Sequence, residues 1–526
     1  MPDQTVTIAP DAARGGARGV GPAAEAVALA DVVVIGAGQA GLAVAAHLAR
    51  SGFVPVTDPD RASAGRAPGA PTFVVLDAAS GPGGAWRERW PGLTMRTVNG
   101  VYELPGAPLP EFAPDEPAAR ALTRYFGAYE RDLDLAVRRP VQVRRVRDLG
   151  GPDHLLAVET VERPPVVAPA IVPGPAAVRA TAPDPALVPA SGPGTPAGNP
   201  SAPSVPAASG GRRHGPEAGV PVQEGEDLGG GAGACRPVAG PVPADPALDP
   251  TSPGGPARPR VPLPPGDGVR EDLAAVTHRR TARTWHARAL VNATGTWTRP
   301  FWPTYPGTDE FAGTQLHTHD FHLPEDLAGR RVIVVGGGIS AVQHLLAIHP
   351  VAAATTWVTR RPPDWRDAEF SPEIGRDAVA RVDARTRAGL PPQSVVAATG
   401  LPLTDAYRAG IVSGVLRARP MFARLVRDGA LWDAATAGGP VAPGWETGPE
   451  HVTADVVLWA TGFRAALDHL RPLGLRDAGG GIVMDGTEVV ADPRVQLVGY
   501  GPSASTVGAN RAGRAAVRQV RRLLGL

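Results

Sequence analysis

The chain has 526 residues, a length typical of two or three domains rather than one. Its 52 basic residues, all of them Arg, nearly balance 51 acidic ones, and the net charge of +1 argues against a nucleic-acid binder. The single cysteine, Cys235, excludes an internal disulfide framework and a CxxC redox pair. No stretch is apolar for long enough to span a bilayer, and the first residues do not resemble a secretory signal. We therefore expect a cytoplasmic protein with no membrane or nucleic-acid partner.

The composition changes sharply along the chain. Residues 1–28 are small and polar without a clear period, which predicts a disordered leader. Between Val161 and Arg270 lie 26 of the 60 prolines and no aromatic residue, so this part cannot bury enough apolar surface to fold. We predict a disordered Pro/Gly/Ala-rich insertion over residues 162–268. Cys235 lies inside it, which favours an exposed bystander over a catalytic thiol.

The remaining chain alternates apolar β-branched runs with helical patterns, which predicts parallel α/β layers. Two runs, Val141–Val146 and Leu155–Val161, suggest an antiparallel excursion interrupted by the insertion. Helices are expected at Ala118–Asp132 and Asn510–Leu524. The clearest strands are Val32–Ile35, Phe73–Leu76, Leu290–Asn292, Val332–Val335, Thr356–Thr359, Val456–Trp459 and Val495–Val498.

A glycine fingerprint follows the first of these strands. Val32–Ile35 leads into Gly36, Gly38 and Gly41, and a helical stretch over residues 42–50 comes next. In this strand–loop–helix arrangement the glycines allow a tight turn, close approach of a pyrophosphate and close helix–strand packing. The helix N-terminus offers unpaired N–H groups to the phosphates. The motif predicts a dinucleotide site.

An acidic residue at the end of the second strand would hold a ribose hydroxyl of that dinucleotide. Asp58 has the usual spacing from Gly36, but the prolines around it do not suit a central strand. Asp77 ends a proper strand, and the Pro/Gly-rich stretch from Pro55 to Pro71 explains its greater distance, so we choose Asp77.

A second glycine cluster, Gly81–Arg87, follows Asp77 and contains Gly84 and Trp86. The ring system of a flavin needs close backbone approach and an aromatic wall, which these two residues would supply. The alternative is a surface turn with a packed Trp.

A second fingerprint begins three hundred residues after the first. Arg331–Val335 leads into Gly336 and Gly338, then Ser340 and Ala341, and a helix is expected over residues 342–348. Ala is tolerated at the third fingerprint position. This sequence predicts a second dinucleotide site.

Arg360 and Arg361 follow the next strand of this unit, Thr356–Thr359, where an acid would bind a free ribose 2′-hydroxyl. Arginine instead offers a forked, permanently charged partner for a 2′-phosphate, which predicts NADPH rather than NADH. The alternative is a solvated strand end in an Arg-rich protein.

Two dinucleotide sites on one chain are what an enzyme needs to pass hydride from a nicotinamide to a flavin. Two strands, ending near Asn292 and Trp459, each run into Ala-Thr-Gly, where small residues permit close backbone approach. We expect four of these residues to border the cofactors: Thr294, Gly295, Thr461 and Gly462. The aromatic segment Trp297–Trp302 is interpreted as interdomain packing rather than a substrate cage.

A family resemblance appears just before the second fingerprint. The chain has Phe311, Gly313, His317 and Phe321 in the pattern FxGxxxHxxxF. In this it resembles the class B flavin-dependent monooxygenases, which include flavin-containing monooxygenases, N-hydroxylases and Baeyer–Villiger enzymes. It departs from the family at His322, where the family usually has Lys, Pro or Asp. Phe321 stands where Baeyer–Villiger enzymes have Trp, which makes the chain more similar to flavin-containing monooxygenases and N-hydroxylases. The spacing of His317, His319 and His322 does not match a structural zinc site, and no metal is expected.

The resemblance implies two doubly wound Rossmann-type domains and the cofactors FAD and NADPH. It also implies a reaction in which a C4a-hydroperoxyflavin, formed with O₂, transfers one oxygen atom to a small organic substrate at an N, S or carbonyl centre. Many family members have an Asn that stabilises this species. In this chain Asn99 lies in the same region but is displaced from the family position. Asn-Gly is also a common turn dipeptide, which is the alternative interpretation.

Two other functions stay open at this point: an NAD(P)H–flavin reductase or oxidase without oxygen transfer, and a redox-inactive flavoprotein scaffold. The predicted FAD domain is discontinuous, with the NADPH domain placed within it. Its three parts are residues 29–161, residues 269–320 with an interdomain bridge, and residues 446–526; the NADPH domain is predicted over residues 321–445.

Overall fold

The computed structural model describes residues 26–58, 69–98, 100–162, 281–367, 372–392, 400–439, 441–504 and 506–526. Asn99, Cys235 and nearly all of the expected leader and insertion lie outside these residues. One boundary is corrected: the first strand begins at Ala26, so residues 26–28 belong to a sheet and not to the leader.

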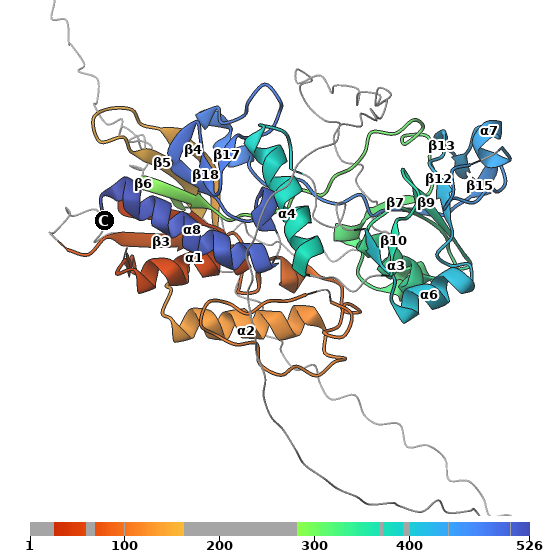
Figure 1. The fold of residues 1–526 in the computed structure, drawn as a ribbon, viewed down its shortest axis with the longest axis horizontal. Helices are drawn as coiled ribbons and strands as arrows, with labels where there is room; N and C mark the ends of the chain where they lie inside the picture. The colour runs from red at the N-terminus through yellow and green to blue at the C-terminus, as the bar shows by residue number, and fades with distance from the viewer. Residues whose placement is uncertain are drawn as a thin grey trace, which may run out of the picture. The chain divides into compact units, whose positions relative to one another are not determined.

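The first sheet is built around β1 (Ala26–Ile35), the strand that precedes the first fingerprint (Figure 1). It pairs in parallel with β3 (Thr72–Leu76) and with β6 (Thr281–Asn292). Beyond these, β2 (Val54–Pro55) and β19 (Asp492–Leu497) extend the parallel part on either side. The strands predicted at 32–35, 73–76, 290–292 and 495–498 are confirmed, although β1, β6 and β19 start earlier than the sequence indicated and β19 ends at Leu497.

An antiparallel extension covers the first half of β6. β4 (Val141–Asp148) pairs with β5 (Leu156–Glu162), and β5 pairs with β6 from Thr281 to Ala287. The expected antiparallel excursion is therefore confirmed. A short hairpin of β17 (Met484–Asp485) and β18 (Glu488–Val489), which the sequence did not suggest, joins the other edge at β19.

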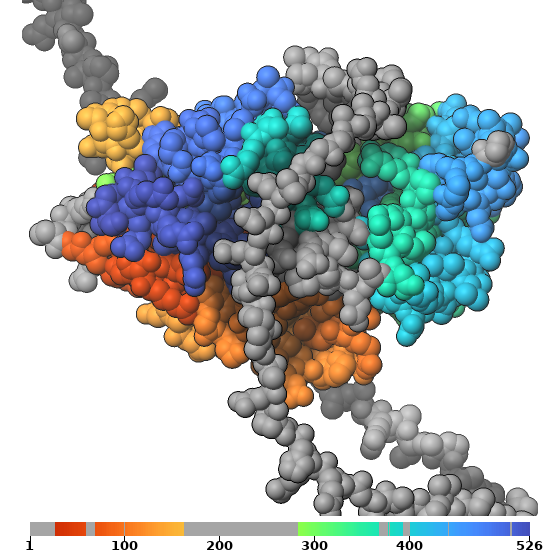
Figure 2. Space-filling model, viewed as in Figure 1, coloured from red at the N-terminus to blue at the C-terminus, as the bar shows by residue number. Residues whose placement is uncertain are grey.

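Both faces of the central strands are buried, as expected for a parallel sheet covered on two sides. On one face Val32, Val34 and Val291 pack with residues of α1 (Gln39–Arg50) and α8 (Thr506–Leu524). These two helices lie side by side in Figures 1 and 2, and Gly513 of α8 sits where a Cβ would be 3.2 Å from the backbone of Ala43. On the other face the alternate residues pack beneath β4 and β5.

The helix α2 (Ala118–Asp132) has the bounds that its amphipathic pattern predicted. Leu122, Tyr125 and Phe126 lie on its buried side. Tyr125 donates its hydroxyl to the carbonyl of Ala107 at 2.6 Å and accepts the N–H of Leu104 at 2.8 Å. These bonds attach α2 to the loop that follows the second glycine cluster.

The second sheet has five parallel strands in the order β12-β9-β8-β16-β7. Two of its strands correct the predicted domain map. β7 precedes residue 321 and β16 follows residue 445, yet β16 pairs with β8 on one side and β7 on the other. The strands are β7 (Thr314–His317), β8 (Arg331–Val335), β9 (Ala354–Thr359), β12 (Ala418–Pro420) and β16 (Val456–Trp459).

Helices and small sheets complete this part of the chain. The helices are α3 (Ile339–Ile348), α4 (Pro372–Arg387), α6 (Asp405–Val412) and α7 (Ala434–Ala437). The small sheets contain β10 (Trp365–Arg366) with β11 (Leu401–Pro402), and β13 (Arg424–Val426), β14 (Gly429–Leu431) and β15 (His451–Thr453). The 3₁₀ turns are η2 (Gly84–Glu88), η3 (Thr318–Asp320), η4 (Pro324–Leu327), η5 (Asp468–Leu473) and η6 (Gly501–Ala504). Across the described ranges, no helix combines the length and apolar character needed to cross a membrane.

Two adjacent valines test the unexpected hairpin. Val489 is fully buried in the core of the first sheet, whereas Val490 is 54% exposed. Val489→Ala should lower the free energy of unfolding by about 2 kcal/mol, because two methylene equivalents leave a packed core. Val490→Ala should change it by less than about 0.5 kcal/mol. Urea unfolding of both variants measures the difference, and equal effects would contradict the burial of β18.

Candidate functional site

The first fingerprint forms the loop between β1 and α1. Gly36 has φ 96°, and a Cβ at this position would lie 2.6 Å from the carbonyl oxygen of Ala293. A Cβ at Gly41 would lie 1.9 Å from the oxygen of Gly36. Gly38 differs, because its added Cβ would meet only Gly84 Cα at 3.9 Å. Gly36 and Gly41 are therefore required by packing within the chain, whereas Gly38 leaves space at the N-terminus of α1.

The predicted flavin loop lies directly on this fingerprint. Gly84 has φ 53°, and a Cβ there would come within 2.7 Å of Gly38 Cα. Gly84 begins η2, and Trp86 in that turn packs against the core below α1. The structure therefore brings together the two glycine clusters that the sequence placed more than forty residues apart.

Asp77 follows β3 at the carboxyl edge of the first sheet and is buried. Its Oδ2 pairs with Nε of Arg139 at 2.6 Å. Arg139 also forms two hydrogen bonds to Glu130, of 2.6 and 2.7 Å. The sequence gave no signal for this ion-pair network, because Arg139 lies 62 residues from Asp77. One carboxylate oxygen of Asp77 is thus committed to Arg139.

The two Ala-Thr-Gly segments occupy equivalent places in the two sheets. Ala293 donates its N–H to Ile35 O at 2.8 Å, and Ala460 donates to Val335 O at 2.8 Å. The hydroxyl of Thr294 donates a hydrogen bond of 2.8 Å to the carbonyl oxygen of Ala466. The N–H of Ala466 in turn donates to the carbonyl oxygen of Gly295 at 2.9 Å. Each segment therefore supports a glycine loop from the neighbouring strand.

The second fingerprint repeats the first. A Cβ at Gly336, which has φ 150°, would lie 2.3 Å from the oxygen of Ala460, whereas a Cβ at Gly338 would meet nothing within 4 Å. Ser340 and Ala341 lie in the first turn of α3, and Ala341 is fully buried. The loop thus leaves open space at the same position as the first one.

Arg360 and Arg361 follow β9, next to the strand that carries the second fingerprint. Both side chains are exposed. Within the described ranges, neither has a hydrogen bond or an ion pair that would occupy its guanidinium. They are available to a ligand at this strand end.

His317 of the expected family signature is fully buried at the end of β7. Its Nδ1 accepts the backbone N–H of His319 at 3.0 Å, so the proton is on Nε2, which donates to Gly462 O at 3.0 Å. Burial lowers the pKa of His317 to about 4 and keeps the ring neutral. Gly462 also accepts the N–H of Phe301 at 2.9 Å, and the hydroxyl of Thr461 donates to Phe301 O at 2.6 Å.

The other signature residues are packing residues. Phe311 is buried, and a Cβ at Gly313 would lie 2.4 Å from the Phe311 ring and 2.5 Å from Asp455 O. Phe321 lies 5.4 Å from Trp90 and 4.5 Å from His344, measured between ring centroids. Among the described residues, no group of three His, Cys, Asp or Glu side chains is arranged to hold a metal ion.

Segments that follow both sheets meet in an aromatic junction, defined here as Arg89, Trp90, Trp297, His344 and Phe463. Trp297, beyond β6, stacks on Phe463, beyond β16, with centroids 4.9 Å apart. Trp90 lies 5.8 Å from the ring of His344. Arg89, Trp90 and His344 were not predicted as site residues, and the only signal was the Trp-Pro-Gly turn after the flavin loop.

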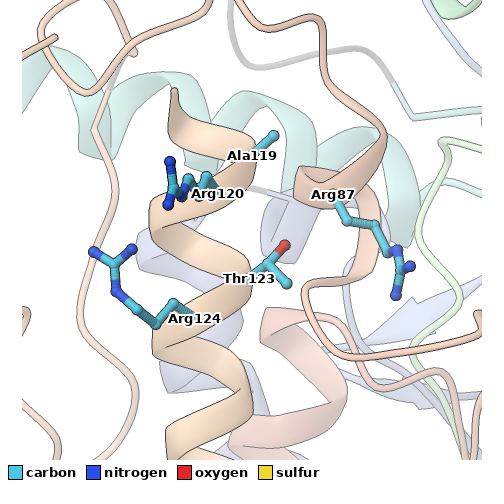
Figure 3. A pocket seen from close by; sticks show the side chains of 5 residues that line it. All are labelled: Arg87, Ala119, Arg120, Thr123 and Arg124. Atoms are coloured by element: carbon cyan, nitrogen blue, oxygen red, sulfur yellow. The ribbon is translucent and has the colours of Figure 1, made fainter. Parts of the chain in front are cut away.

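A separate pocket of about 540 Å³ lies between the loop containing Arg87 and the helix α2 (Figure 3). Thr123 and Ala119 face that loop, whereas Arg120 and Arg124 extend from the opposite side of the helix (Figure 3). Arg124 is also paired with Glu116 at 2.6 Å. The three arginines do not converge, so the pocket is not a built anion site.

Comparisons with known proteins place this geometry in a family. The family model described as pyridine nucleotide-disulphide oxidoreductase matches residues 271–391. A Baeyer–Villiger monooxygenase of Streptomyces coelicolor is 32% identical over 129 residues, which is 24% of this chain and 22% of the relative. The trimethylamine monooxygenase of Pelagibacter ubique is 35% identical over 72 residues, 14% of this chain and 16% of the relative. The matched segments thus span less than a quarter of these curated relatives.

Solved structures extend the likeness to nearly the whole chain. A flavin-containing monooxygenase from Stenotrophomonas maltophilia is 25% identical, covers 94% of this chain and 99% of its own, and has a TM-score of 0.57. Together with the matches above, this likeness supports the resemblance expected from the sequence: the chain is similar to class B flavin-dependent monooxygenases. The described part of the chain accordingly has a Rossmann-type α/β fold.

The free space at Gly38 and Gly338 generates a paired prediction. Both residues have backbone angles that any residue adopts, so Gly38→Val and Gly338→Val should fold. The new side chain would fill the space a pyrophosphate needs. Gly38→Val should lose the flavin and keep binding of the pyridine nucleotide, and Gly338→Val should do the reverse. Flavin absorbance and nucleotide titration check each variant against the other, and a fully yellow Gly38→Val protein would contradict the assignment.

His344 generates a pH prediction. It is buried, both ring nitrogens lack a hydrogen-bond partner, and burial, with smaller effects of His317 and Arg89, lowers its pKa to about 3. From the ordinary value of about 6.5 down to about 3, the unfolded chain binds a proton that the folded chain does not, so acid destabilises the fold. Between pH 7.5 and pH 4.5, His344→Leu should therefore lose about 3 kcal/mol less stability than the wild type. Urea unfolding at both pH values measures this, with the exposed His154→Gln as control; parallel losses in all three proteins would refute it.

Proposed function

We propose that this protein is an FAD-dependent, NADPH-using monooxygenase that transfers one oxygen atom from O₂ to a small organic substrate at an N, S or carbonyl centre. The observation that carries the proposal is the aromatic junction, where Trp297 from the flavin side stacks on Phe463 from the pyridine-nucleotide side. A hydride donor and a flavin need such a meeting point.

The first site fits a flavin dinucleotide. Gly36 and Gly41 close the turn, and the space beside Gly38 would take the pyrophosphate at the N-terminus of α1. Asp77 would hold the ribose through its second carboxylate oxygen, since the first is bound to Arg139. Gly84, Trp86, Thr294 and Gly295 would border the ring system. When bound, the flavin supplies the redox and oxygen chemistry, as cofactors do in this class of reaction.

The second site fits NADPH. The space beside Gly338 would take the pyrophosphate, with Ser340 and Ala341 at the start of α3. The exposed Arg360 and Arg361 would bind the 2′-phosphate through charge-assisted hydrogen bonds. Thr461 and Gly462 would border the nicotinamide end, although the Thr461 hydroxyl already donates to Phe301 O.

The chain's own contribution is to position the cofactors and exclude water. His317 and His344 are buried and neutral, so they provide rigid packing rather than proton transfer at neutral pH. The aromatic rings around them form an apolar wall, which would exclude water from the place where the cofactors react. The role expected for Asn99 stays a prediction, because that residue lies outside the described ranges.

The relatives' names indicate substrate classes to test first. They include trimethylamine and dimethylaniline monooxygenases as well as Baeyer–Villiger enzymes, which favours screening tertiary amines, sulfides and ketones. A flavin reductase or oxidase without oxygen transfer, and a redox-inactive scaffold, are the competing functions.

The decisive experiment is turnover of the holoenzyme under ¹⁸O₂ with NADPH and a panel of such substrates. Incorporation of one ¹⁸O atom per molecule of product, with matching NADPH consumption, is expected. NADPH oxidation that yields only hydrogen peroxide across the panel would favour the reductase or oxidase. A flavin that NADPH does not bleach would favour the scaffold.

Nucleotide preference gives a further prediction. Each charge-assisted contact to a 2′-phosphate contributes about 1.5–3 kcal/mol, or roughly 10- to 100-fold in affinity. Arg360→Ala with Arg361→Ala should therefore raise the KM for NADPH by about that factor and leave the KM for NADH and the flavin content unchanged. Steady-state kinetics with both nucleotides measure it. Arg417→Ala, which removes another exposed arginine near the second sheet, is the control. Equal losses with NADPH and NADH would contradict the role.

A further inference from the structure

Arg89 is a charged residue within the aromatic junction. It follows η2, and its Cζ lies 4.1 Å from the ring centroid of Trp297 and 5.8 Å from that of Trp86. Its Nε is buried and has no hydrogen-bond partner. In the part of the chain that the structure describes, no carboxylate pairs with the guanidinium. Burial lowers the pKa of Arg89 to about 10, which leaves it charged at neutral pH.

Other arginines with limited exposure have partners. Arg139 is bound by Asp77 and Glu130, and Arg494 by Asp148 and Asp492. Arg419 stacks on Trp432 at 3.9 Å, much as Arg89 does on Trp297, but it donates to Pro449 O at 2.8 Å. A desolvated charge without a counter-ion costs free energy. An anion bound to the Arg89 guanidinium would therefore lower the free energy of this site.

Only one edge of the Arg89 guanidinium is buried. Nε is fully buried, but the two terminal nitrogens are not among the buried unpartnered atoms. Since they have no partner in the chain, they reach accessible space. The Trp297 ring stacks on one face of the Arg89 guanidinium and holds it in place. The N–H groups of the guanidinium are therefore pre-organised for a planar, bidentate acceptor.

The location of Arg89 favours a substrate over a dinucleotide phosphate. The phosphate-binding spaces lie beside Gly38 and Gly338, each at a helix N-terminus. Arg89 instead lies among tryptophan rings, and its neighbour Trp90 packs against Phe321, which follows η3. This is the place where the flavin and nicotinamide rings of the proposed function would meet, and where a substrate would react.

We propose that Arg89 binds an anionic group, a carboxylate, on the organic substrate and so determines substrate specificity. The proposal rests on the proposed function for the reaction that the bound substrate undergoes, but anion binding at Arg89 is testable without turnover. It implies that acid-bearing amines, sulfides or ketones are preferred over their neutral or cationic analogues, because only an anion neutralises the guanidinium.

The test compares benzoate with benzamide, its neutral analogue of similar shape, as ligands of the flavin-loaded holoenzyme. Calorimetry or the perturbation of the flavin spectrum gives the two dissociation constants. Benzoate should bind at least about 10-fold more tightly, since a hydrogen-bonded contact to a charged group contributes that much. Arg89→Gln should abolish the preference. Arg120→Gln, which removes an exposed arginine of α2, should retain it.

Arg89→Lys is a second variant in case Arg89→Gln does not accumulate as folded holoenzyme. It keeps the charge but loses the planar fork, so the affinity for benzoate should fall several-fold while that for benzamide stays constant. Equal binding of benzoate and benzamide by the wild type would overturn the proposal. Loss of flavin or of NADP⁺ affinity in the Arg89 variants, with benzoate binding intact, would also overturn it and assign Arg89 to a cofactor.

The ¹⁸O experiment separates this proposal from the proposed function. A holoenzyme that oxygenates a neutral sulfide but does not prefer benzoate would contradict only the role of Arg89. A holoenzyme that prefers benzoate through Arg89 but incorporates no ¹⁸O would contradict only the monooxygenase function.

Discussion

Both glycine loops depend on one backbone contact, made once in each sheet. A Cβ at Gly36 would lie only 2.6 Å from the carbonyl oxygen of Ala293, and a Cβ at Gly336 only 2.3 Å from that of Ala460. Because a peptide carbonyl fills that space, the loop must turn with a glycine. The neighbouring strand thereby sets the path of each loop and leaves open space at the N-terminus of α1 and of α3, where backbone N–H groups favour phosphate.

The aromatic junction depends on this arrangement. Gly84 rests on Gly38, so η2 starts at the first loop and carries Arg89 and Trp90 away from it. Trp90 then packs against Phe321 and His344, while Trp297 packs against Phe463. The contacts between the two sides are mainly apolar, and the buried histidines stay neutral within them. A low-dielectric junction of this kind strengthens any ion pair formed inside it. The unpartnered guanidinium of Arg89 would therefore attract an anion more strongly there than at the protein surface.

Interpretation of the sequence succeeded where structure depends on local pattern. The period of α2, the β-branched runs of the central strands and the two strand–glycine–helix motifs are properties of neighbouring residues, and they were identified with nearly correct bounds. It failed where membership in a sheet depends on distant pairing. β7 and β16 were assigned to the flavin domain, although β16 pairs with β8 more than a hundred residues earlier. The short β17–β18 hairpin carries too few residues to show a period of its own.

The sequence by itself indicated the resemblance to class B flavin-dependent monooxygenases, because the two fingerprints and the signature around His317 are fixed spacings of residues. It also predicted which residues could line two dinucleotide sites. Only the tertiary structure decided how these residues are used: Asp77 shares its carboxylate with Arg139, His317 bonds to Gly462 instead of facing solvent, and Arg89 alone in the junction lacks an anion among the described residues. Each of these facts depends on which groups far apart in the chain become neighbours and on how much water they lose, and neither quantity is encoded in local spacing.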